Sequence, residues 1–302
     1  MWALQYIGDL LVSGSTDRTL RVWDAETGVC VHELTGHTST VRSLQVKGTV
    51  AVSGSRDATL RVWDIQNGTC RFVLRGHTDS VRCLEINGDV VVSGSYDCTL
   101  IVWDMNTGKT LHKLVGHIDK IYSLSFDGNV VVSGSLDRTI RIWNPKNGQC
   151  TRVLEGKLFH SPFFMFLVFS PSLSKLEFYS SIISGHRQLV GLLQLRKNIL
   201  VSGNADRTLK VWNVETGDCV YTLNGHDSAV TCLQFDDTKL LSGSDDGTLK
   251  LWDLRTGKFI RNLVEKVEVV WRLQFNETKL VAAIQRQAAT NVDVFDFNPS
   301  SL

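Results

Sequence analysis

The residues that could do chemistry recur in sets along this 302-residue chain. In five places a His is followed by Ser at +16, Asp at +20 and Trp at +26. Ser, His and Asp are the components of a triad for nucleophilic catalysis. An enzyme needs only one triad, however, and repetition at fixed offsets favours a structural network in which buried polar groups are partners of one another. The predicted network consists of the five serines with His37, Asp57, Trp63, His77, Asp97, Trp103, His117, Asp137, Trp143, His186, Asp206, Trp212, His226, Asp246 and Trp252.

The elements that position these sets are predicted to be short strands. Motifs like VSGSRDATLRVWD recur six times, and their tryptophans lie 40 residues apart except for one step of 69. Each unit holds short β-branched or alternating segments that are separated by Gly, Asn and Asp. In the second unit the expected strands are VRSLQV, TVAVSGS, TLRVWD and TCRFVL. A four-stranded unit of this length with a Trp-Asp dipeptide indicates a β-propeller blade.

These motifs resemble the WD-repeat family over nearly the whole chain. The resemblance implies an all-β fold, a single WD-repeat β-propeller spanning residues 1–302, and a structural role for the repeated network. Six units are followed by a degenerate seventh, residues 269–297, that lacks its Trp and its fourth strand. We therefore expect about seven blades of an eight-bladed parent, in a chain that is a fragment or an incomplete gene product.

Composition argues against several other classes of protein. The 32 basic and 31 acidic residues give a net charge of +1, which disfavours a nucleic-acid binder with a broad basic surface. The seven cysteines contain no C-x-x-C pair, so no metal site or disulfide framework is predicted. We expect reduced, buried thiols in a nuclear or cytoplasmic protein, with Cys30, Cys70, Cys150 and Cys219 in the core. The longest apolar run, residues 163–169, is too short to span a membrane, and no cofactor motif is present.

The 69-residue step contains a foreign insertion, residues 157–185. Its removal joins LEG to HRQLV and restores the 40-residue period. The insertion could be a surface loop, a hydrophobic docking segment or a translated intron. Its Phe, Ser and Leu are what a pyrimidine-rich tract encodes, and the Gly-Lys and Ser-Gly at its ends can be encoded by splice sites. We therefore favour the intron.

We expect the mature transcript to lack the bases that encode residues 157–185. Amplification of the transcript across codons 150 and 190 should give a product shorter than that from genomic DNA, which serves as the control. A mature message that retains the segment would contradict the intron interpretation.

Function is expected where the aligned units differ at exposed positions. One such position follows the first apolar residue of the first strand, and the other is x in Ser-Gly-Ser-x-Asp. Arg42 and Arg82 occupy the first position and Arg56 the second, so three arginines lie on adjacent units. Guanidinium groups match phosphate oxygens, and arginine clusters recur in the recognition of phosphorylated peptides. The alternative is ordinary surface arginines in weak local ion pairs.

Motifs such as SGSTDRTLRVWDAETG, SGSRDATLRVWD and LVSGNAD are similar to those of the F-box/WD-repeat family, the substrate receptors of SCF ubiquitin ligases. The resemblance implies a non-enzymatic propeller that binds phosphorylated degrons and directs substrates to ubiquitination. We find no F-box, through which SCF subunits would be bound. The alternative is a general WD-repeat scaffold that does not read phosphate. The implied phosphopeptide-binding residues are Arg42, Arg56, Arg82, Arg18, Ser39, Thr40, Tyr96, Trp2, Thr16 and Arg286.

Overall fold

The computed structural model describes residues 3–154, 186, 188–276, 278–287 and 289–296. The insertion at 157–185 and Trp2 lie outside these residues. The chain forms two compact units, one of Met1–Asp137, Arg141–Arg152 and Leu195–Lys197, and one of Arg138–Ile140, Val153–Gln194 and Asn198–Leu302. In the described ranges no helix is long and apolar enough to cross a membrane.

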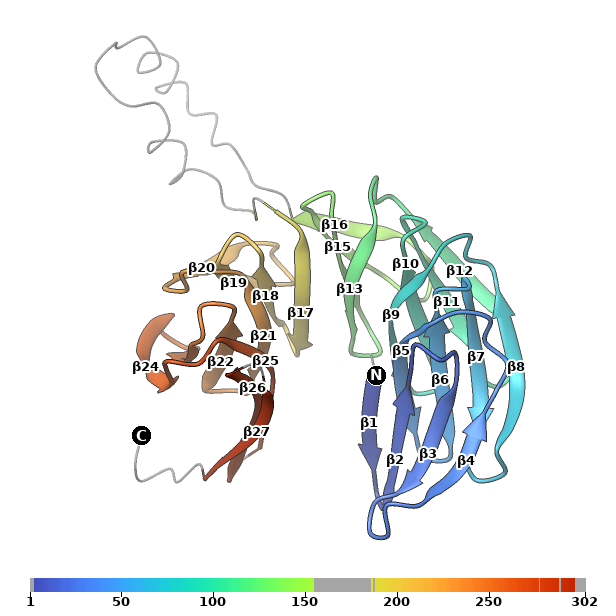
Figure 1. Ribbon diagram of the computed structural model, residues 1–302. Coiled ribbons are helices and arrows are strands. Elements are labelled where there is room, and N and C mark those ends of the chain that lie inside the picture. Colours follow the sequence, from blue (N-terminus) through green and yellow to red (C-terminus); the bar gives the residue numbers. More distant parts are fainter. Residues whose placement is uncertain (1–2, 155–185, 187, 277, 288, 297–302) are drawn as a thin grey trace. The chain divides into compact units, whose positions relative to one another are not determined.

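The strands form antiparallel sheets in which neighbours in sequence are neighbours in space (Figure 1). The first four sheets are blades 1 to 4. Blade 1 has β1 (Ala3–Ile7), β2 (Leu10–Gly14), β3 (Leu20–Asp24) and β4 (Cys30–Leu34); blade 2 has β5 (Val41–Lys47), β6 (Val50–Ser55), β7 (Thr59–Asp64) and β8 (Thr69–Arg75); blade 3 has β9 (Val81–Asn87), β10 (Val90–Ser95), β11 (Thr99–Asp104) and β12 (Thr110–Val115); blade 4 has β13 (Ile121–Phe126), β14 (Val131–Ser135), β15 (Ile140–Trp143) and β16 (Cys150–Leu154).

The remaining three sheets are blades 5 to 7. Blade 5 has β17 (Val190–Arg196), β18 (Ile199–Asn204), β19 (Thr208–Asn213) and β20 (Cys219–Asn224); blade 6 has β21 (Val230–Phe235), β22 (Lys239–Ser244), β23 (Leu249–Asp253) and β24 (Lys258–Val264); blade 7 has β25 (Val269–Phe275), β26 (Lys279–Arg286) and β27 (Ala289–Asp296). The predicted all-β fold with seven blades is confirmed, as is the three-stranded seventh blade.

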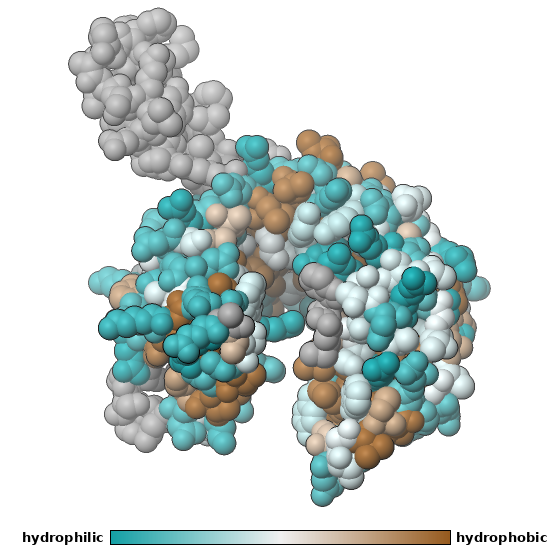
Figure 2. Space-filling model, viewed as in Figure 1, coloured by the Kyte–Doolittle hydropathy of each residue, from teal (hydrophilic) through white to brown (hydrophobic). Residues whose placement is uncertain are grey.

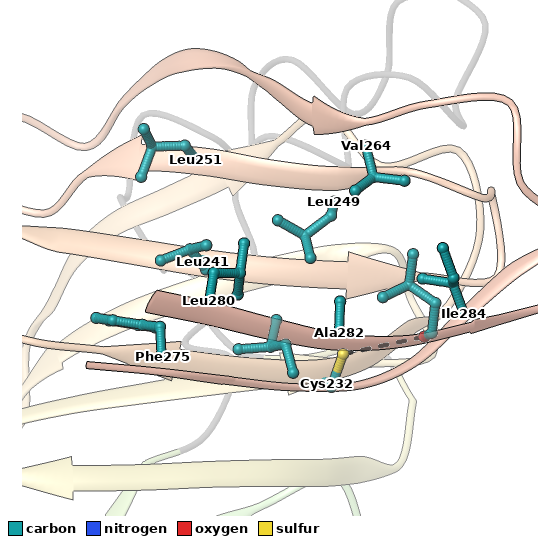
Figure 3. Packing of buried hydrophobic residues seen from close by; sticks show 11 residues of the cluster. Cys232, Leu241, Leu249, Leu251, Val264, Phe275, Leu280, Ala282 and Ile284 are labelled. Atoms are coloured by element: carbon teal, nitrogen blue, oxygen red, sulfur yellow. Dashed lines mark hydrogen bonds between the residues drawn. The ribbon is translucent and has the colours of Figure 1, made fainter. Parts of the chain in front are cut away.

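The core consists of apolar residues packed between successive blades. Between blades 6 and 7, Leu241, Leu249 and Leu251 of one sheet contact Leu280, Ala282 and Ile284 of the other (Figure 3). Alternate residues of each strand face a neighbouring blade, which is why β-branched and leucine residues recur with a period of two. Burial of each such side chain contributes about 1.5–3 kcal/mol.

Blade 7 exposes positions that are buried in every other blade. Val292 is 66% exposed and Val294 is 59% exposed. The equivalent residues of blade 6 are Leu249 and Leu251, because Phe295 occupies the position of the blade 6 Trp. Both leucines are 0% exposed. Figure 2 shows apolar side chains on the surface over this sheet. In blade 6 the equivalent residues are buried against blade 7, whereas no buried cluster of the described residues includes Val292 or Val294, so these side chains face solvent.

The cysteine positions correct one expectation. Cys30, Cys70 and Cys150 are exposed and Cys219 is half-buried, so the prediction that they belong to the core is wrong. The physical reason is that they lie on fourth strands, which form the outer edge of each blade. Along β8, for example, only Leu74 is buried. Cys232, which lies on the innermost strand β21, is buried.

Glutamine side chains join the innermost strands of neighbouring blades. The Gln5 amide donates to the Val46 carbonyl at 3.3 Å and accepts the Val46 N–H. Gln234 makes the same pair of bonds to Phe275, at 2.9 and 2.6 Å. A third clasp joins Gln194 to Phe235. Each glutamine amide pairs with the backbone N–H and C=O of one residue on the innermost strand of the neighbouring blade. This strand is an edge of its sheet, and backbone groups on an edge are costly to leave unpaired.

Glu85 of β9 replaces the glutamine at this position in blade 3. Instead of contacting the backbone of Phe126, its carboxyl accepts a hydrogen bond from the Gln45 amide at 3.0 Å. Burial raises the pKa of Glu85 to about 7, although the bond from Gln45 opposes the shift. The ionisable side chains on the strands packed against β9 are Arg42 and Lys47 on β5 and Tyr122 on β13, and the Lys47 ammonium donates to the Gly88 carbonyl.

We expect Glu85→Gln to stabilise the protein, and more so as the pH rises. The folded-state pKa is raised, so wild-type stability that is present below pH 4.5 is lost as the pH rises through about 7. An amide carries no such cost, and the gain at pH 8 should be about 3 kcal/mol. The urea midpoints of both proteins at pH 5 and pH 8 measure this. Gln45→Glu is the matched control and should destabilise. An equal effect of Glu85→Gln at both pH values would contradict the prediction.

Candidate functional site

The repeated Ser, His, Asp and Trp form one hydrogen-bond network in each of blades 2 to 6. In blade 2 the Trp63 indole N–H donates to the Ser53 hydroxyl at 2.8 Å. The Ser53 hydroxyl contacts His37 Nε2 at 2.8 Å, and His37 Nδ1 contacts Asp57 at 2.8 Å. A neutral imidazole with its proton on Nδ1 satisfies all of these groups, because the serine then donates to Nε2. The same bonds recur around Ser93, Ser133, Ser202 and Ser242.

Burial decides between a structural and a catalytic role for the network. The serine–histidine–aspartate order is that of a triad, but Ser53 is 0% exposed and the His37 side chain is 0% exposed. A nucleophile needs room for a reacting atom about 3 Å away. The serine oxygen also accepts the indole N–H, so no substrate can reach it. The buried hydrogen bonds therefore suit a structural role for the network.

The network keeps its carboxylates ionised. Burial alone would raise the pKa of Asp57, but hydrogen bonds from His37 and Thr59 outweigh it and hold the pKa far below 3.8. Asp97 is shifted downward for the same reasons. Burial lowers the pKa of His226 below 6.5, against the opposing effect of Asp246. In blade 6 the stable form near neutral pH is therefore a neutral His226 imidazole beside the Asp246 carboxylate.

We expect the free energy of unfolding to fall as the pH drops below about 6.5. The unfolded chain then binds protons at His186 and His226, whose folded-state pKa values are lowered, so the folded state binds fewer protons. A further loss follows below 3.8, where unfolded aspartates are protonated. Urea midpoints between pH 7.5 and 5 measure the first step. The Glu85→Gln background removes the opposing contribution of Glu85. A midpoint that stays constant or rises with acid in that background would refute this account.

A β-bulge marks the first variable position in five blades. The pairing of β5 with β6 skips Arg42, passing from Val41 to Ser43. The pairing of β9 with β10 skips Arg82 in the same way, and β13 with β14 skips Tyr122. A bulge leaves one residue outside the ladder and redirects its side chain. The bulge therefore explains why this residue varies while its neighbours keep the repeat.

The second variable position lies at the same end of each blade. The Arg56 N–H donates to the Thr40 carbonyl at 2.9 Å, and the Tyr96 N–H donates to the Ser80 carbonyl at 3.0 Å. These carbonyls immediately precede β5 and β9. The turn is held further by Ser55, whose hydroxyl donates to the Ser39 carbonyl at 3.1 Å. The two variable positions of a blade are thus joined through the backbone.

Most of the predicted binding residues lie at these blade ends in the first of the two compact units. Arg56 is exposed, Arg42 and Arg82 are half-buried, and Ser39 and Thr40 are half-buried beside Arg42. Neither Arg56 nor Arg82 forms a salt bridge with an acid of the described chain, unlike Arg71, which pairs with Asp64 at 2.5 Å. The Arg56 and Arg82 guanidinium groups can therefore contact an anionic ligand.

The other predicted binding residues belong to blade 1 and blade 7. Thr16 and Arg18 are exposed in the turn between β2 and β3, where Arg18 has a φ of 75°. This is the left-handed position of the turn, held by Asp17, whose carboxylate accepts the Thr19 hydroxyl at 2.7 Å. Arg286 belongs to the second unit and forms a salt bridge with Asp293 at 2.8 Å. Its role in binding stays a prediction.

The structure adds aromatic and cationic neighbours that we did not include in the predicted site. The rings of Tyr96 and Tyr122 pack in a tilted arrangement, with their centroids 5.1 Å apart and their planes inclined by 41°. The Arg82 guanidinium lies 6.0 Å from the Tyr122 centroid, and the Lys120 ammonium lies 5.2 Å from the Tyr96 centroid. Burial raises the pKa of Tyr122, and Tyr96 adds to the shift. Tyr122 occupies the first variable position of blade 4, whereas the sequence carried no signal for Lys120.

Comparison with known proteins gives the family. The model of the WD domain, G-beta repeat, matches residues 3–24, 28–64, 68–104, 108–144, 179–213 and 217–253. The chain belongs to the WD-repeat family. The crystal structure of the computationally designed Ika8 protein is similar with a TM-score of 0.82 and 35% identity, over 97% of this chain and 82% of that one. WD-repeat propellers of this kind are interaction modules, and the buried network agrees with a non-catalytic role.

Curated relatives match over short stretches. Cell division control protein 4 of Saccharomyces cerevisiae is 60% identical over 47 residues, 15% of this chain and 6% of that protein. The probable E3 ubiquitin ligase complex SCF subunit scon-2 of Neurospora crassa is 49% identical over 43 residues, 14% of this chain and 7% of that protein. Each match is about as long as one blade.

Proposed function

We propose that this WD-repeat propeller binds phosphorylated peptides at the ends of blades 2 and 3, and that it recognises substrates for an SCF-type ubiquitin ligase. The observation that carries the proposal is the placement of Arg42, Arg56 and Arg82 at bulges and turns of adjacent blades. Planar guanidinium donors at such positions suit the oxygens of a phosphate group.

The relatives support the ligase part of the proposal. One relative is named as an SCF subunit, and the motifs of the chain resemble those of F-box/WD repeat-containing protein 7, a substrate receptor. The substrates would be proteins with phosphorylated degrons, in the nucleus or cytoplasm. Contact with the ligase would need an F-box, as in the family that the chain resembles.

The second candidate is a WD-repeat scaffold that holds partners without reading phosphate. The exposed valines of blade 7 favour this reading, because apolar side chains on a sheet surface are typical of protein contacts. It predicts that binding is independent of phosphorylation and does not depend on the arginines.

We expect a phosphothreonine–proline peptide to bind, and Arg82→Ala to weaken binding by about tenfold or more. A charge-assisted hydrogen bond contributes about 1.5–3 kcal/mol, which sets this magnitude. Fluorescence anisotropy with the phosphorylated and unphosphorylated peptide measures it. Arg152→Ala, an exposed arginine on the outer strand β16, is the matched control and should bind normally. Equal affinity for both peptides would rule out phosphate recognition and favour the scaffold.

A further inference from the structure

An arginine lies beside an exposed cysteine at the outer edges of blades 2 and 4. Cys70 on β8 and Cys150 on β16 are both exposed. The Arg61 guanidinium on β7 donates to the Cys70 sulfur at 3.7 Å, and the Arg141 guanidinium on β15 donates to the Cys150 sulfur at 4.0 Å. The same pair in two repeats therefore places a permanent cation against a thiol that solvent can reach.

The Arg61 guanidinium is held in place, yet its charge is not compensated by an acid. It lies 5.7 Å from the centroid of the Trp63 ring and packs against Gly36, where a Cβ would displace it. The Nε atoms of Arg61 and Arg141 are buried without an acceptor, and neither arginine forms a salt bridge within the described residues. A guanidinium whose acceptor is a neutral thiol can therefore still pair with an anion.

Blade 1 has the same exposed thiol, but its arginine is compensated. Cys30 is exposed like Cys70. The Arg21 Nε donates to the Glu33 carboxylate at 3.3 Å, and the same guanidinium lies 3.6 Å from the Asp17 carboxylate. The charge of Arg21 is therefore directed at two acids and not at the thiol.

The repeat explains why these two acids do not hold the arginine of blade 2. Val73 takes the place of Glu33 on the fourth strand. The counterpart of Asp17 is Asp57, whose carboxylate contacts His37 at 2.8 Å in the buried network. Blade 4 repeats both differences. One acid is thus replaced and the other is engaged, which leaves the guanidinium directed at the cysteine.

From this arrangement we propose that Cys70 and Cys150 form mixed disulfides with small disulfides that carry a carboxylate. The carboxylate pairs with the guanidinium, whose planar donors match it, and the deprotonated cysteine sulfur attacks one sulfur of the small disulfide. That S–S bond breaks as the new one forms, and the other half leaves as a thiolate that takes the proton lost by the cysteine. The cysteine is thereby oxidised, and half of the small disulfide is reduced to a thiol.

The surroundings of these thiols are those in which reactive cysteines occur. Such cysteines lie in electropositive, partly exposed places, and mixed disulfides with small thiols are a reversible modification of them. Both pairs lie on the two outermost strands of their blades. The proposal therefore does not depend on phosphate binding at the blade ends.

The experiment compares an anionic and a cationic disulfide at each cysteine. The protein is exposed to dithiobis(nitrobenzoate) or to cystamine, the remaining thiols are alkylated, and mass spectrometry of the peptides gives the rate at each site. Division of the rate ratio at one cysteine by the ratio at Cys30 cancels the intrinsic reactivity of the reagents. At low ionic strength we expect this normalised ratio to be about fivefold or more at Cys70 and Cys150, as one uncompensated charge a few ångströms away would give.

Two substitutions test the role of the arginine. Arg61→Gln should lower the ratio at Cys70 to that of Cys30, while Cys150 in the same protein keeps its value and shows that the fold is intact. Glu33→Val gives blade 1 the residue found in blade 2 and should raise the anionic preference at Cys30. Equal ratios at Cys30 and Cys70 in the wild-type protein, or a ratio at Cys70 that Arg61→Gln leaves unchanged, would overturn the proposal.

Discussion

One buried serine hydroxyl in each of blades 2 to 6 determines how the blade end is built. The hydroxyl of Ser53 on β6 joins Trp63 on β7 to His37, which lies in the loop that precedes β5. His37 in turn contacts Asp57, and the Asp57 carboxylate accepts the Thr38 N–H at 2.8 Å. Loss of any member would leave the others buried without a partner, a cost of about 1–3 kcal/mol for each group. The loop that holds Ser39 and Thr40 is therefore fixed from within the blade.

The bulges and the network together allow the blade ends to vary without cost to the core. Arg42, Arg82 and Tyr122 all lie outside the ladder, so their side chains are not constrained by strand pairing. Val41, Val81 and Ile121 beside them are 0% exposed and must stay apolar. A phosphate-binding residue can replace a neutral one at the bulge while the adjoining residue keeps the fold. The proposed site is thus confined to positions that the repeat leaves free.

Sequence periodicity was enough to predict the strands, the network and the three-stranded seventh blade, because each of these features depends on residues within one sequence repeat. Features that depend on a neighbouring blade were not predicted. The clasps of Gln5 and Gln234 join residues 41 positions apart, and the exposure of Cys70 depends on what covers β8. The contact of Lys120 with Tyr96 also crosses from one blade to the next. A repeated motif specifies the backbone of a blade, whereas these contacts depend on which residues two different blades bring together.

The same distinction governs what similarity can say about function. Matches of 43 and 47 residues are about as long as one blade, so they report the residues that build the repeat. Arg56 and Leu136 occupy equivalent turns of two blades and make the same backbone hydrogen bond, yet only the arginine side chain can bind an anion. Similarly, Glu85 and Gln234 share a strand position, but only the carboxyl titrates near neutral pH. Because the blades share one backbone arrangement, the residues that differ between equivalent positions are the ones that distinguish a phosphate-binding propeller from a general scaffold.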